Sequence, residues 1–325
     1  MTEALHPLRF EPIFKKAIWG GDALRPMFGR KPPTEAEGEA WVVSDQGDNQ
    51  SRVIDGPWKG QTLRDLMLHH QRELLGDSPP SNGLFPLLLK FLDARAPLSV
   101  QVHPNDEQAR RLDPTGPGLG KTEAWLVLDA QPDSLLYTGL RPGITAKKFR
   151  EALTSDELPE VMHAFHPQPG DCLFLEAGTL HAIGAGLLLF EVQQTSDITY
   201  RLYDWGRIDA KTGLPRQLHI EQALACTNVE RGACKPVNPV MMGDRERLVE
   251  CRYFTLDRIR SDRPFAVGQA NVCKLVVCVD GSAEVRHAGG RYPLTRGGVL
   301  LFPASIGPGE CIPSGNATIL ECGIP

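Results

Sequence analysis

The sequence lacks the marks of several large classes of protein. No apolar run reaches the roughly 18 residues that a membrane-spanning helix needs. No long basic tract is present, and the formal net charge is −5, from 35 basic and 40 acidic residues. Nucleic acid is therefore not an expected partner. The start, M-T-E-A-L-H-P-L-R-F, has no charged segment followed by an apolar core, so we expect no signal peptide and no association with a membrane.

Cysteine occurs without a C-x-x-C pair. The eight cysteines are spread from Cys172 to Cys322. This pattern is typical of reduced structural thiols, and a disulfide framework is not expected in a chain of this length. We therefore expect a cytoplasmic protein. Because the net charge is negative, an anionic substrate would have to be met by local cations.

What the chain does contain is many turn-forming residues, 32 Gly and 27 Pro among 325, and these predict many short strands. The length predicts about two domains. The proline-rich segment K-P-V-N-P-V, 235–240, divides the chain into an N-terminal domain, 1–235, and a C-terminal domain, 236–325. The second alternates short apolar runs with turns, which predicts a β-sandwich or barrel.

Short helices are predicted only in the N-terminal half. The longest begins after Thr62, a good N-cap, and stops at Gly76. The others are predicted over 105–112, 145–153, 155–165 and 220–226. Strands are predicted between them, including 86–92 and 98–102.

The strand over 98–102 has one polar face. Ser99, Gln101 and His103 alternate with apolar residues, so their side chains point the same way. A lone histidine is more often a satisfied core or surface residue than a ligand. The presence of Gln101 on the same face as His103 favours a metal-binding role, because both side chains can bind one ion.

The segment Gly120-Lys121-Thr122 ends like a phosphate-binding P-loop, but this interpretation fails. Thr115 stands where that motif requires glycine, and a strand rather than a helix is predicted to follow. Glu123 is therefore placed at the start of a strand, beside Lys121. A solvated Lys/Glu pair is the simplest alternative to a functional role.

The stretch 171–207 is predicted to form strands joined by tight turns, and it contains several charged side chains. It carries His181, Glu191, Asp197, Arg201 and Arg207. With the earlier segments it completes a set of candidate metal ligands: Gln101, His103, Glu123 and His181. Two imidazoles, a carboxylate and an amide suit Zn²⁺, and the same set could hold Fe²⁺ or Mn²⁺. Structural hydrogen bonding is the alternative role for Glu191 and Asp197.

The segment around His181 is close to the second cupin motif, G-x5-P-x-G-x2-H-x3-N. Gly170, Gly178 and His181 match, whereas Glu176 replaces the proline and Ala185 the asparagine. In the C-terminal domain, Gly297-x5-Pro303 begins the same pattern. Ser305 and Pro308 occupy its glycine and histidine positions, so that copy could not bind a metal there. We therefore expect a mainly β protein with two cupin-type jelly rolls, one of them degenerate, and a few short helices inserted in the N-terminal half.

Longer blocks extend this likeness over most of the chain. They are F-E-P-I-F-K-K-A-I-W-G-G (10–21), E-G-E-A-W-V-V-S (37–44), P-L-L-L-K-F-L-D-A-R-A-P-L-S-V-Q-V-H-P (86–104), G-K-T-E-A-W (120–125), A-G-T-L-H-A-I-G-A-G (177–186) and S-D-I-T-Y-R-L-Y-D-W-G-R (196–207). In these blocks the chain resembles the type I mannose-6-phosphate isomerases, particularly the short bacterial form. Ala40, where serine is usual, lies outside the candidate ligands.

The resemblance implies a zinc enzyme, with one Zn²⁺ per chain, that interconverts mannose 6-phosphate and fructose 6-phosphate. By position the zinc ligands are Gln101, His103, Glu123 and His181. Arg201 matches the family's active-site arginine, Lys121 the lysine two residues before the glutamate ligand, and Ser99 the serine before the glutamine ligand. Glu191 matches an acidic position between the histidine ligand and that arginine. Arg207 stands, by offset only, where longer relatives carry a lysine.

These residue types suit the reaction. Aldose–ketose isomerisation moves a proton between C1 and C2 through an enediol or enediolate, and a metal and an arginine stabilise the developing charge. Glu191 or Lys121 could be the base, and Asp197 is a third candidate, for ring opening. The phosphate needs donors such as Ser99, Arg207 or Lys121.

Two other functions fit parts of the sequence. A non-catalytic sugar-phosphate sensor on this fold would have lost a ligand or Arg201, and all are present. An iron-dependent cupin oxygenase would leave Lys121 and Arg201 without a role, and metal content would distinguish it. The sequence leaves open the substrate range among 6-phosphosugars, the direction of the reaction in the cell and the choice between monomer and homodimer.

Overall fold

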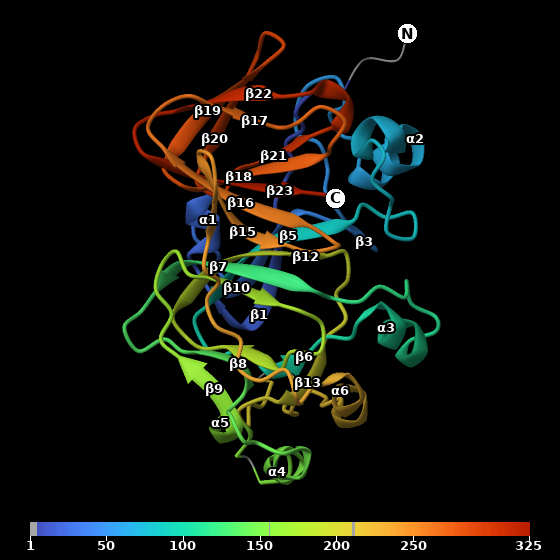
Figure 1. Ribbon diagram of the computed structural model, residues 1–325, viewed down its shortest axis with the longest axis vertical. Helices are drawn as coiled ribbons and strands as arrows, with labels where there is room; N and C mark the ends of the chain where they lie inside the picture. Colours follow the sequence, from blue (N-terminus) through green and yellow to red (C-terminus); the bar gives the residue numbers. More distant parts are fainter. Residues whose placement is uncertain (1–4, 156, 210–211) are drawn as a thin grey trace.

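A computed structural model describes residues 5–155, 157–209 and 212–325, and it confirms the mainly β architecture. Two β-sandwiches lie one above the other along the long axis (Figure 1). Most strand pairs join strands that are not consecutive in the chain, so the antiparallel sheets, rather than local propensity, determine which side chains meet. No helix in these ranges is long and apolar enough to cross a membrane.

The N-terminal sandwich consists of two sheets. The first has the order β1 (Ile13–Gly21), β2 (Glu37–Val43), β5 (Leu87–Ala94), β12 (Leu187–Gln194), β7 (Glu123–Ala130) and β10 (Cys172–Leu175). The second has the order β13 (Tyr200–Tyr203), β6 (Val100–Val102), β11 (His181–Ile183), β8 (Leu136–Leu140) and β9 (Met162–Phe165). Side chains from both sheets, among them Trp125 and Leu189 from the first and Ile183 from the second, form a common core between them.

The C-terminal sandwich has the same plan. One sheet has the order β14 (Val240–Met242), β15 (Arg245–Glu250), β16 (Thr255–Ser261), β23 (Ala317–Gly323), β18 (Lys274–Asp280) and β21 (Val299–Phe302). The other has the order β17 (Phe265–Val267), β22 (Gly309–Pro313), β19 (Ser282–His287) and β20 (Gly290–Thr295). A short 3₁₀ helix, η1 (Ala304–Ile306), occupies the place where the degenerate cupin motif departs from the pattern.

The two sandwiches share a continuous core. Leu63, Phe85 and Phe91 from the N-terminal half belong to one buried cluster with Phe254 and Leu275 from the C-terminal half. The chain start also crosses over, because Leu8 pairs with Leu301 through two backbone hydrogen bonds of 2.8 and 2.9 Å. Burial of apolar surface therefore holds the halves together as one body.

Four of the predicted helices are present with the expected caps or bounds. In α2 (Leu63–Leu75), the side chain of Thr62 accepts a hydrogen bond from the Asp65 amide, and Gly76 at φ +68° ends the helix. Asn105 caps α3 (Asp106–Leu112) and Thr145 caps α4 (Ala146–Ala152). The last is α6 (Ile220–Cys226). A short helix that was not predicted, α1 (Leu24–Met27), follows β1, and β3 (Asp45–Gln46) and β4 (Asn49–Gln50) form a small hairpin.

The helix predicted over 155–165 is wrong for most of its length. Among the described residues of this range, only α5 (Leu158–Val161) is helical, and the residues after it form β9, which pairs with β8. Asp156 lies outside the described residues. Pro159 is compatible with a helix only in its first turn, and the apolar run that follows suits a strand equally well. Pairing with β8 decides between the two.

Candidate active site

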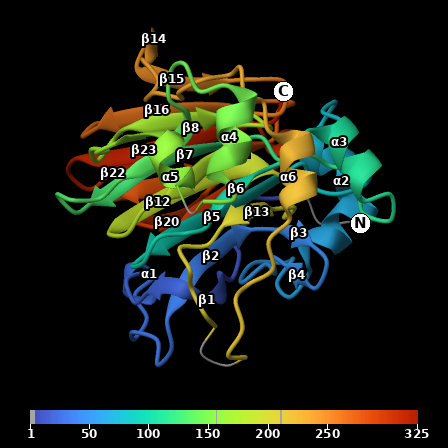
Figure 2. The same ribbon diagram turned by 90° about the horizontal axis from the view of Figure 1, so that it is seen from below.

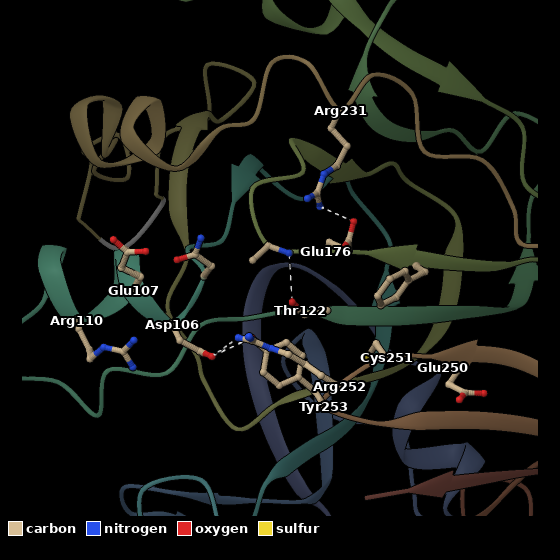
Figure 3. Close-up of a pocket in the computed structure, with 13 residues that line it drawn as sticks. Asp106, Glu107, Arg110, Thr122, Glu176, Arg231, Glu250, Cys251, Arg252 and Tyr253 are labelled. Atoms are coloured by element: carbon tan, nitrogen blue, oxygen red, sulfur yellow. Dashed lines mark hydrogen bonds and ion pairs between the residues drawn. The ribbon is translucent and has the colours of Figure 1, made fainter. Parts of the chain in front are cut away.

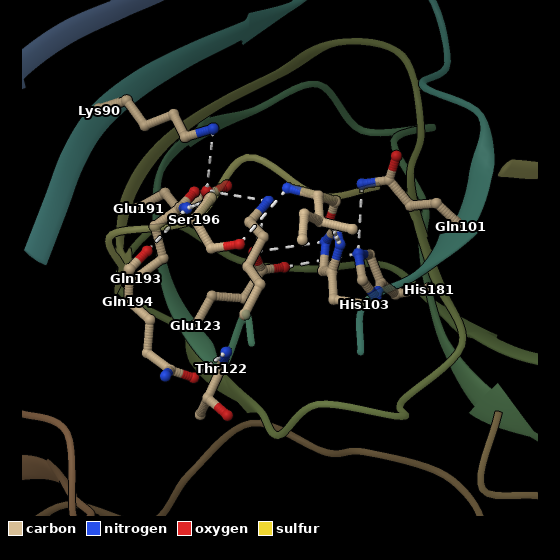
Figure 4. Close-up of polar contacts among 12 residues, drawn as sticks. Lys90, Gln101, His103, Thr122, Glu123, His181, Glu191, Gln193, Gln194 and Ser196 are labelled. Atoms are coloured by element: carbon tan, nitrogen blue, oxygen red, sulfur yellow. Dashed lines mark hydrogen bonds and ion pairs between the residues drawn. The ribbon is translucent and has the colours of Figure 1, made fainter. Parts of the chain in front are cut away.

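Three potential metal-binding side chains converge between the two N-terminal sheets. His103 follows β6, Glu123 opens β7 and His181 opens β11, and one ligand atom from each lies within 4.8 Å of the others. All three are buried. Figure 4 shows both imidazoles directed toward the Glu123 carboxylate. The first sheet supplies the carboxylate and the second supplies the imidazoles, so the site exists only once the sandwich has closed.

The tautomers of both histidines follow from their backbone contacts. Nδ1 of His103 lies 2.8 Å from the Ile198 carbonyl, and Nδ1 of His181 lies 2.9 Å from the Thr179 carbonyl. A carbonyl only accepts, so each Nδ1 must carry the proton and each Nε2 presents a lone pair. The two Nε2 atoms lie 3.6 and 3.4 Å from oxygens of Glu123.

The electrostatics of the cluster suit a bound cation. Burial lowers the pKa of His103 well below its ordinary value and that of His181 to about 4. Burial also raises the pKa of Glu123 to about 7, against the opposing effect of Lys121. Within the described residues, Nε2 of His103 and Oε1 of Glu123 have no hydrogen-bond partner. Lone pairs that face one another in a buried site are stabilised by a bound metal ion, so these residues fit one.

Gln101 lies beside this cluster because of strand register. It is paired directly with His181 across β6 and β11, and its side-chain nitrogen lies 3.3 Å from His181 Nε2. Rotating the amide by half a turn would bring its oxygen to the same place. On its other side, Gln101 is paired with Arg201 of β13. The second sheet therefore places the amide, one imidazole and the arginine side by side.

Lys90 is a charged residue of the site that the sequence analysis missed. It is buried in β5, and its Nζ lies 3.4 Å from Oε1 of Glu191 and 3.5 Å from Oε2 of Glu39. Burial acts to lower the pKa of Lys90, but Glu191, Glu39 and neighbouring carboxylates outweigh this effect and raise it. The signal was available, because a lysine in the middle of L-L-L-K-F-L cannot be buried without a partner.

Glu191 is surrounded by groups that keep it ionised. It is paired across β12 with Lys90 on one side and Trp125 on the other, and Trp125 Nε1 donates a 3.1 Å hydrogen bond to its Oε2. Burial acts to raise the pKa of Glu191, but Lys90 and Lys121 hold it below its ordinary value. Its Oε1 lies 3.4 Å from Lys90 Nζ and 3.7 Å from Lys121 Nζ. The two lysines therefore hold the charge of Glu191 in place.

A cavity of about 270 Å³ brings these groups together with most of the other predicted site residues. Its lining includes Ser99, Gln101, Lys121, Glu191, Asp197 and Arg201, together with Trp19, Glu39, Lys90, Trp125 and Arg216. Lys121 Nζ lies 3.0 Å from Glu123 Oε2, which links the cavity wall to the metal cluster. The volume and the charged lining suit a small, polar, anionic molecule.

Arg207 is placed differently from the other predicted residues. It is not among the residues that line the cavity, and its guanidinium donates hydrogen bonds to the Pro97 carbonyl and to Asp204. Arg216, which the sequence analysis did not single out, does line the cavity. Its Nε donates a 2.8 Å hydrogen bond to Asp204. Asp204 therefore holds both arginines at the edge of the site.

Replacing Asp204 with asparagine is expected to lower stability in a pH-dependent way. Partial burial acts to raise the pKa of Asp204, but hydrogen bonds from Arg216 and Arg207 outweigh it and hold the pKa below its ordinary value. The stabilisation is therefore complete above the unfolded-state value of about 3.9 and is lost as the pH falls through the lower folded-state value. We expect Asp204→Asn to lose on the order of 2 kcal/mol at pH 7, and the difference from wild type to shrink below about pH 4.

Urea unfolding of both proteins between pH 7 and pH 3 measures this difference. Asp48→Asn, a change at an exposed carboxylate, is the matched control and should leave the unfolding free energy unchanged. If the difference in unfolding free energy between wild type and Asp204→Asn stays constant or grows as the pH falls, the charge of Asp204 is not what stabilises the arginine pair.

Comparison with known proteins identifies close relatives along the whole chain. The family model for "Phosphomannose isomerase type I, catalytic domain" matches residues 8–123, and that for "Mannose-6-phosphate isomerase, cupin domain" matches residues 244–319. Mannose-6-phosphate isomerase ManA of Bacillus subtilis is 37% identical over 95% of this chain and 98% of its own. The mannose-6-phosphate isomerase of Streptococcus mutans is 34% identical over 92% and 93%. The crystal structure of the Bacillus subtilis enzyme superimposes with a TM-score of 0.89 over 98% of this chain and all of that one, at 30% identity.

Proposed function

The chain belongs to the type I phosphomannose isomerase family and is an aldose–ketose isomerase that interconverts mannose 6-phosphate and fructose 6-phosphate, and we propose that it does so with one Zn²⁺ per chain. The observation that carries the choice of metal is the donor set at the buried cluster. Two neutral imidazole nitrogens and one carboxylate are ligands that Zn²⁺ prefers, whereas Mg²⁺ and Ca²⁺ prefer oxygen. Gln101 is proposed as the fourth protein ligand, since its amide lies beside His181.

The proposed roles divide between the two sheets. A metal ion bound at this cluster would act as a Lewis acid toward the oxygens at C1 and C2 of the sugar. Arg201, which lines the cavity from the second sheet, is proposed to stabilise the negative charge that develops on those oxygens. Its charge does not titrate in the working range, so it supplies this stabilisation at any physiological pH.

Glu191 is proposed as the group that carries the proton between C2 and C1. It lines the cavity, and its carboxylate is held ionised by Lys90 and Lys121. Lys121 is the less suitable base because it would have to lose the charge that lies 3.0 Å from Glu123. We propose instead that Lys121 and Lys90 keep Glu191 ionised and orient it, while Trp125 fixes its other oxygen.

The phosphate is proposed to bind at the edge formed by Ser99 and Arg216. Both line the cavity, and a guanidinium matches phosphate geometry with two parallel hydrogen bonds. Arg207 is proposed to act through Asp204, which it shares with Arg216, rather than by direct contact. Asp197 also lines the cavity and stays a candidate for ring opening.

A coupled assay for fructose 6-phosphate formed from mannose 6-phosphate tests the proposal. We expect turnover to disappear when the enzyme is treated with a chelator and to return when Zn²⁺ is added. The control is a mock-treated sample carried through the same dialysis. No turnover in protein that holds stoichiometric zinc would favour a sugar-phosphate sensor, and recovery with Fe²⁺ alone would replace zinc by iron.

The thiols support a proposed cytoplasmic location. All eight cysteines are unpaired, six of them are buried, and burial raises the pKa of Cys172 and Cys311 to about 12. Buried, protonated thiols that form no disulfides are typical of a reducing compartment. Cell fractionation with an antibody against the chain would test this location.

A further inference from the structure

A second cavity lies apart from the one that holds the proposed active site. It has a volume of about 850 Å³ and lies between α3, β7 and β10 on one side and the β15–β16 turn of the C-terminal half on the other. Figure 3 shows Thr122 in its wall, with Asp106, Arg252 and Tyr253 next to it. Along the extended chain, Thr122 faces this cavity, whereas Lys121 lines the active-site cavity and Glu123 belongs to the metal cluster. One short segment therefore separates the two cavities.

Asp106 joins that segment to the C-terminal half. Its Oδ1 accepts hydrogen bonds from the Gly120 amide at 2.8 Å and from Gln194 Nε2 at 3.0 Å. Its Oδ2 accepts hydrogen bonds from Arg252 at 2.7 Å and from the Tyr253 hydroxyl at 2.8 Å. Both carboxylate oxygens are thus used in full, Oδ1 toward the catalytic segment and Oδ2 toward the second sandwich. Figure 3 shows Asp106 beside Arg252 and Tyr253.

Gln194 extends this network to the backbone between Lys121 and Glu123. The side-chain Oε1 of Gln194 accepts a 2.9 Å hydrogen bond from the backbone amide of Thr122. The backbone amide of Gln194 donates a 3.1 Å hydrogen bond to the Thr122 carbonyl. Figure 4 shows Gln194 beside Thr122, on the strand that also carries Glu191. Because Thr122 lies between the two functional side chains, holding its backbone on both sides limits how far either can move.

The start of α3 packs closely against the segment that carries Lys121 and Glu123. A Cβ atom added to Gly120 would lie 2.6 Å from the carbonyl carbon of Asn105 and from the amide of Asp106, so only glycine fits there. The Lys121 amide also donates a 2.9 Å hydrogen bond to the Pro104 carbonyl. The carboxylate of Asp106 therefore acts on a backbone that is already in contact with α3.

We propose that Asp106 is a positioning residue of the isomerase, through which Arg252 and Tyr253 of the C-terminal half hold Lys121 and Glu123 in place. The degenerate sandwich thereby contributes to the reaction although it has no metal ligands of its own. Partners of this kind around a metal site matter because a displacement of the ligand-bearing backbone weakens metal binding and catalysis together. The inference rests on the metal-dependent function proposed above.

Three variants, one of them Asp106→Asn, and one control test this inference. Asp106→Ala removes all four hydrogen bonds, and Tyr253→Phe removes one of them from the far side while keeping the ring. Ser78→Ala is the control, because the Ser78 hydroxyl donates to the Ile324 carbonyl at 3.1 Å and so joins the same two halves at a distance from the segment. For each protein, kcat, KM, zinc affinity by chelator competition and melting temperature are measured, with kinetics recorded well below the melting temperature.

We expect Asp106→Ala to lower kcat by roughly 10-fold to 100-fold, with zinc affinity falling in parallel and KM changing little. Tyr253→Phe should lower kcat and zinc affinity by roughly two- to fivefold, and Ser78→Ala should change neither. Asp106→Asn, which keeps one acceptor oxygen, should fall between Asp106→Ala and wild type.

The inference is overturned if folded Asp106→Ala and Tyr253→Phe keep wild-type kcat and zinc affinity and lose only melting temperature, since that is the signature of a purely structural tie. If Asp106→Ala does not fold, the result for Tyr253→Phe decides. Failure of the isomerase function itself would appear as an inactive wild-type enzyme, so the two outcomes are distinguishable.

Discussion

Alanine at position 181 is expected to abolish isomerase activity and metal binding together. His181 supplies one of only two imidazoles in the buried cluster, and its Nε2 lies 3.4 Å from Glu123. Without it, too few protein groups remain to hold the ion, and the Lewis acid contributes several kcal/mol to the reaction. A loss of roughly 10³-fold or more in kcat/KM is therefore expected. Metal analysis of the purified variant should show little zinc.

A matched control for this variant is His287→Ala. His287 also forms a 2.8 Å contact with a backbone carbonyl, that of Ile306, but it lies in the C-terminal sandwich. It should keep both zinc and turnover. Stoichiometric zinc in folded His181→Ala, measured by elemental analysis, would show that the proposed ligand set is wrong.

Lysine at position 201 is expected to leave the metal in place while most of the turnover is lost. Arg201 lines the active-site cavity from β13, and its NH1 is held by a 2.9 Å hydrogen bond to the Gln217 carbonyl. An ammonium keeps the charge but has no planar fork, so it cannot hold the backbone carbonyl and face the substrate at once. By analogy with removal of one donor to a developing oxyanion, kcat should fall by roughly 10²- to 10³-fold.

Steady-state kinetics and zinc content together check this second result. Arg141→Lys is the control, because Arg141 also donates to a backbone carbonyl, that of Met162 at 2.9 Å, but does not line the cavity. Near wild-type kcat for Arg201→Lys would remove Arg201 from the mechanism. A rise in KM with kcat unchanged would assign it to substrate binding alone.

Local patterns in the sequence were sufficient for much of the fold. Thr62 and Gly76 mark the ends of α2, and Asn105 and Thr145 mark the starts of two more helices, because caps act through groups within one turn. The helix predicted over 155–165 failed for the opposite reason. The residues from Met162 onward form a strand only because β8 lies beside them, and no local signal reports a strand that comes from elsewhere in the chain.

The residues of the candidate site also divide into those that local patterns could predict and those that depend on distant strands. Gln101 and His103 could be paired from the alternation of one strand, and the wider ligand set came from the resemblance to a known family. Lys90 and Arg216 were missed, although both line the cavity. A lysine inside an apolar strand signals a buried partner, but which carboxylates it meets depends on the register of β5 against β12.

The sequence by itself determined the residue types available for chemistry, the ends of α2, the starts of α3 and α4, and the two-sandwich architecture, because these depend on local propensity, alternation and a family likeness. Only the tertiary structure decided that Glu123 of one sheet faces the imidazoles of the other, that Glu191 lies between Lys90 and Trp125, and that Asp106 links the catalytic segment to the second sandwich. Each of these contacts joins segments far apart in the chain. Such contacts follow from strand register and from burial of a shared core, which no single stretch of sequence contains.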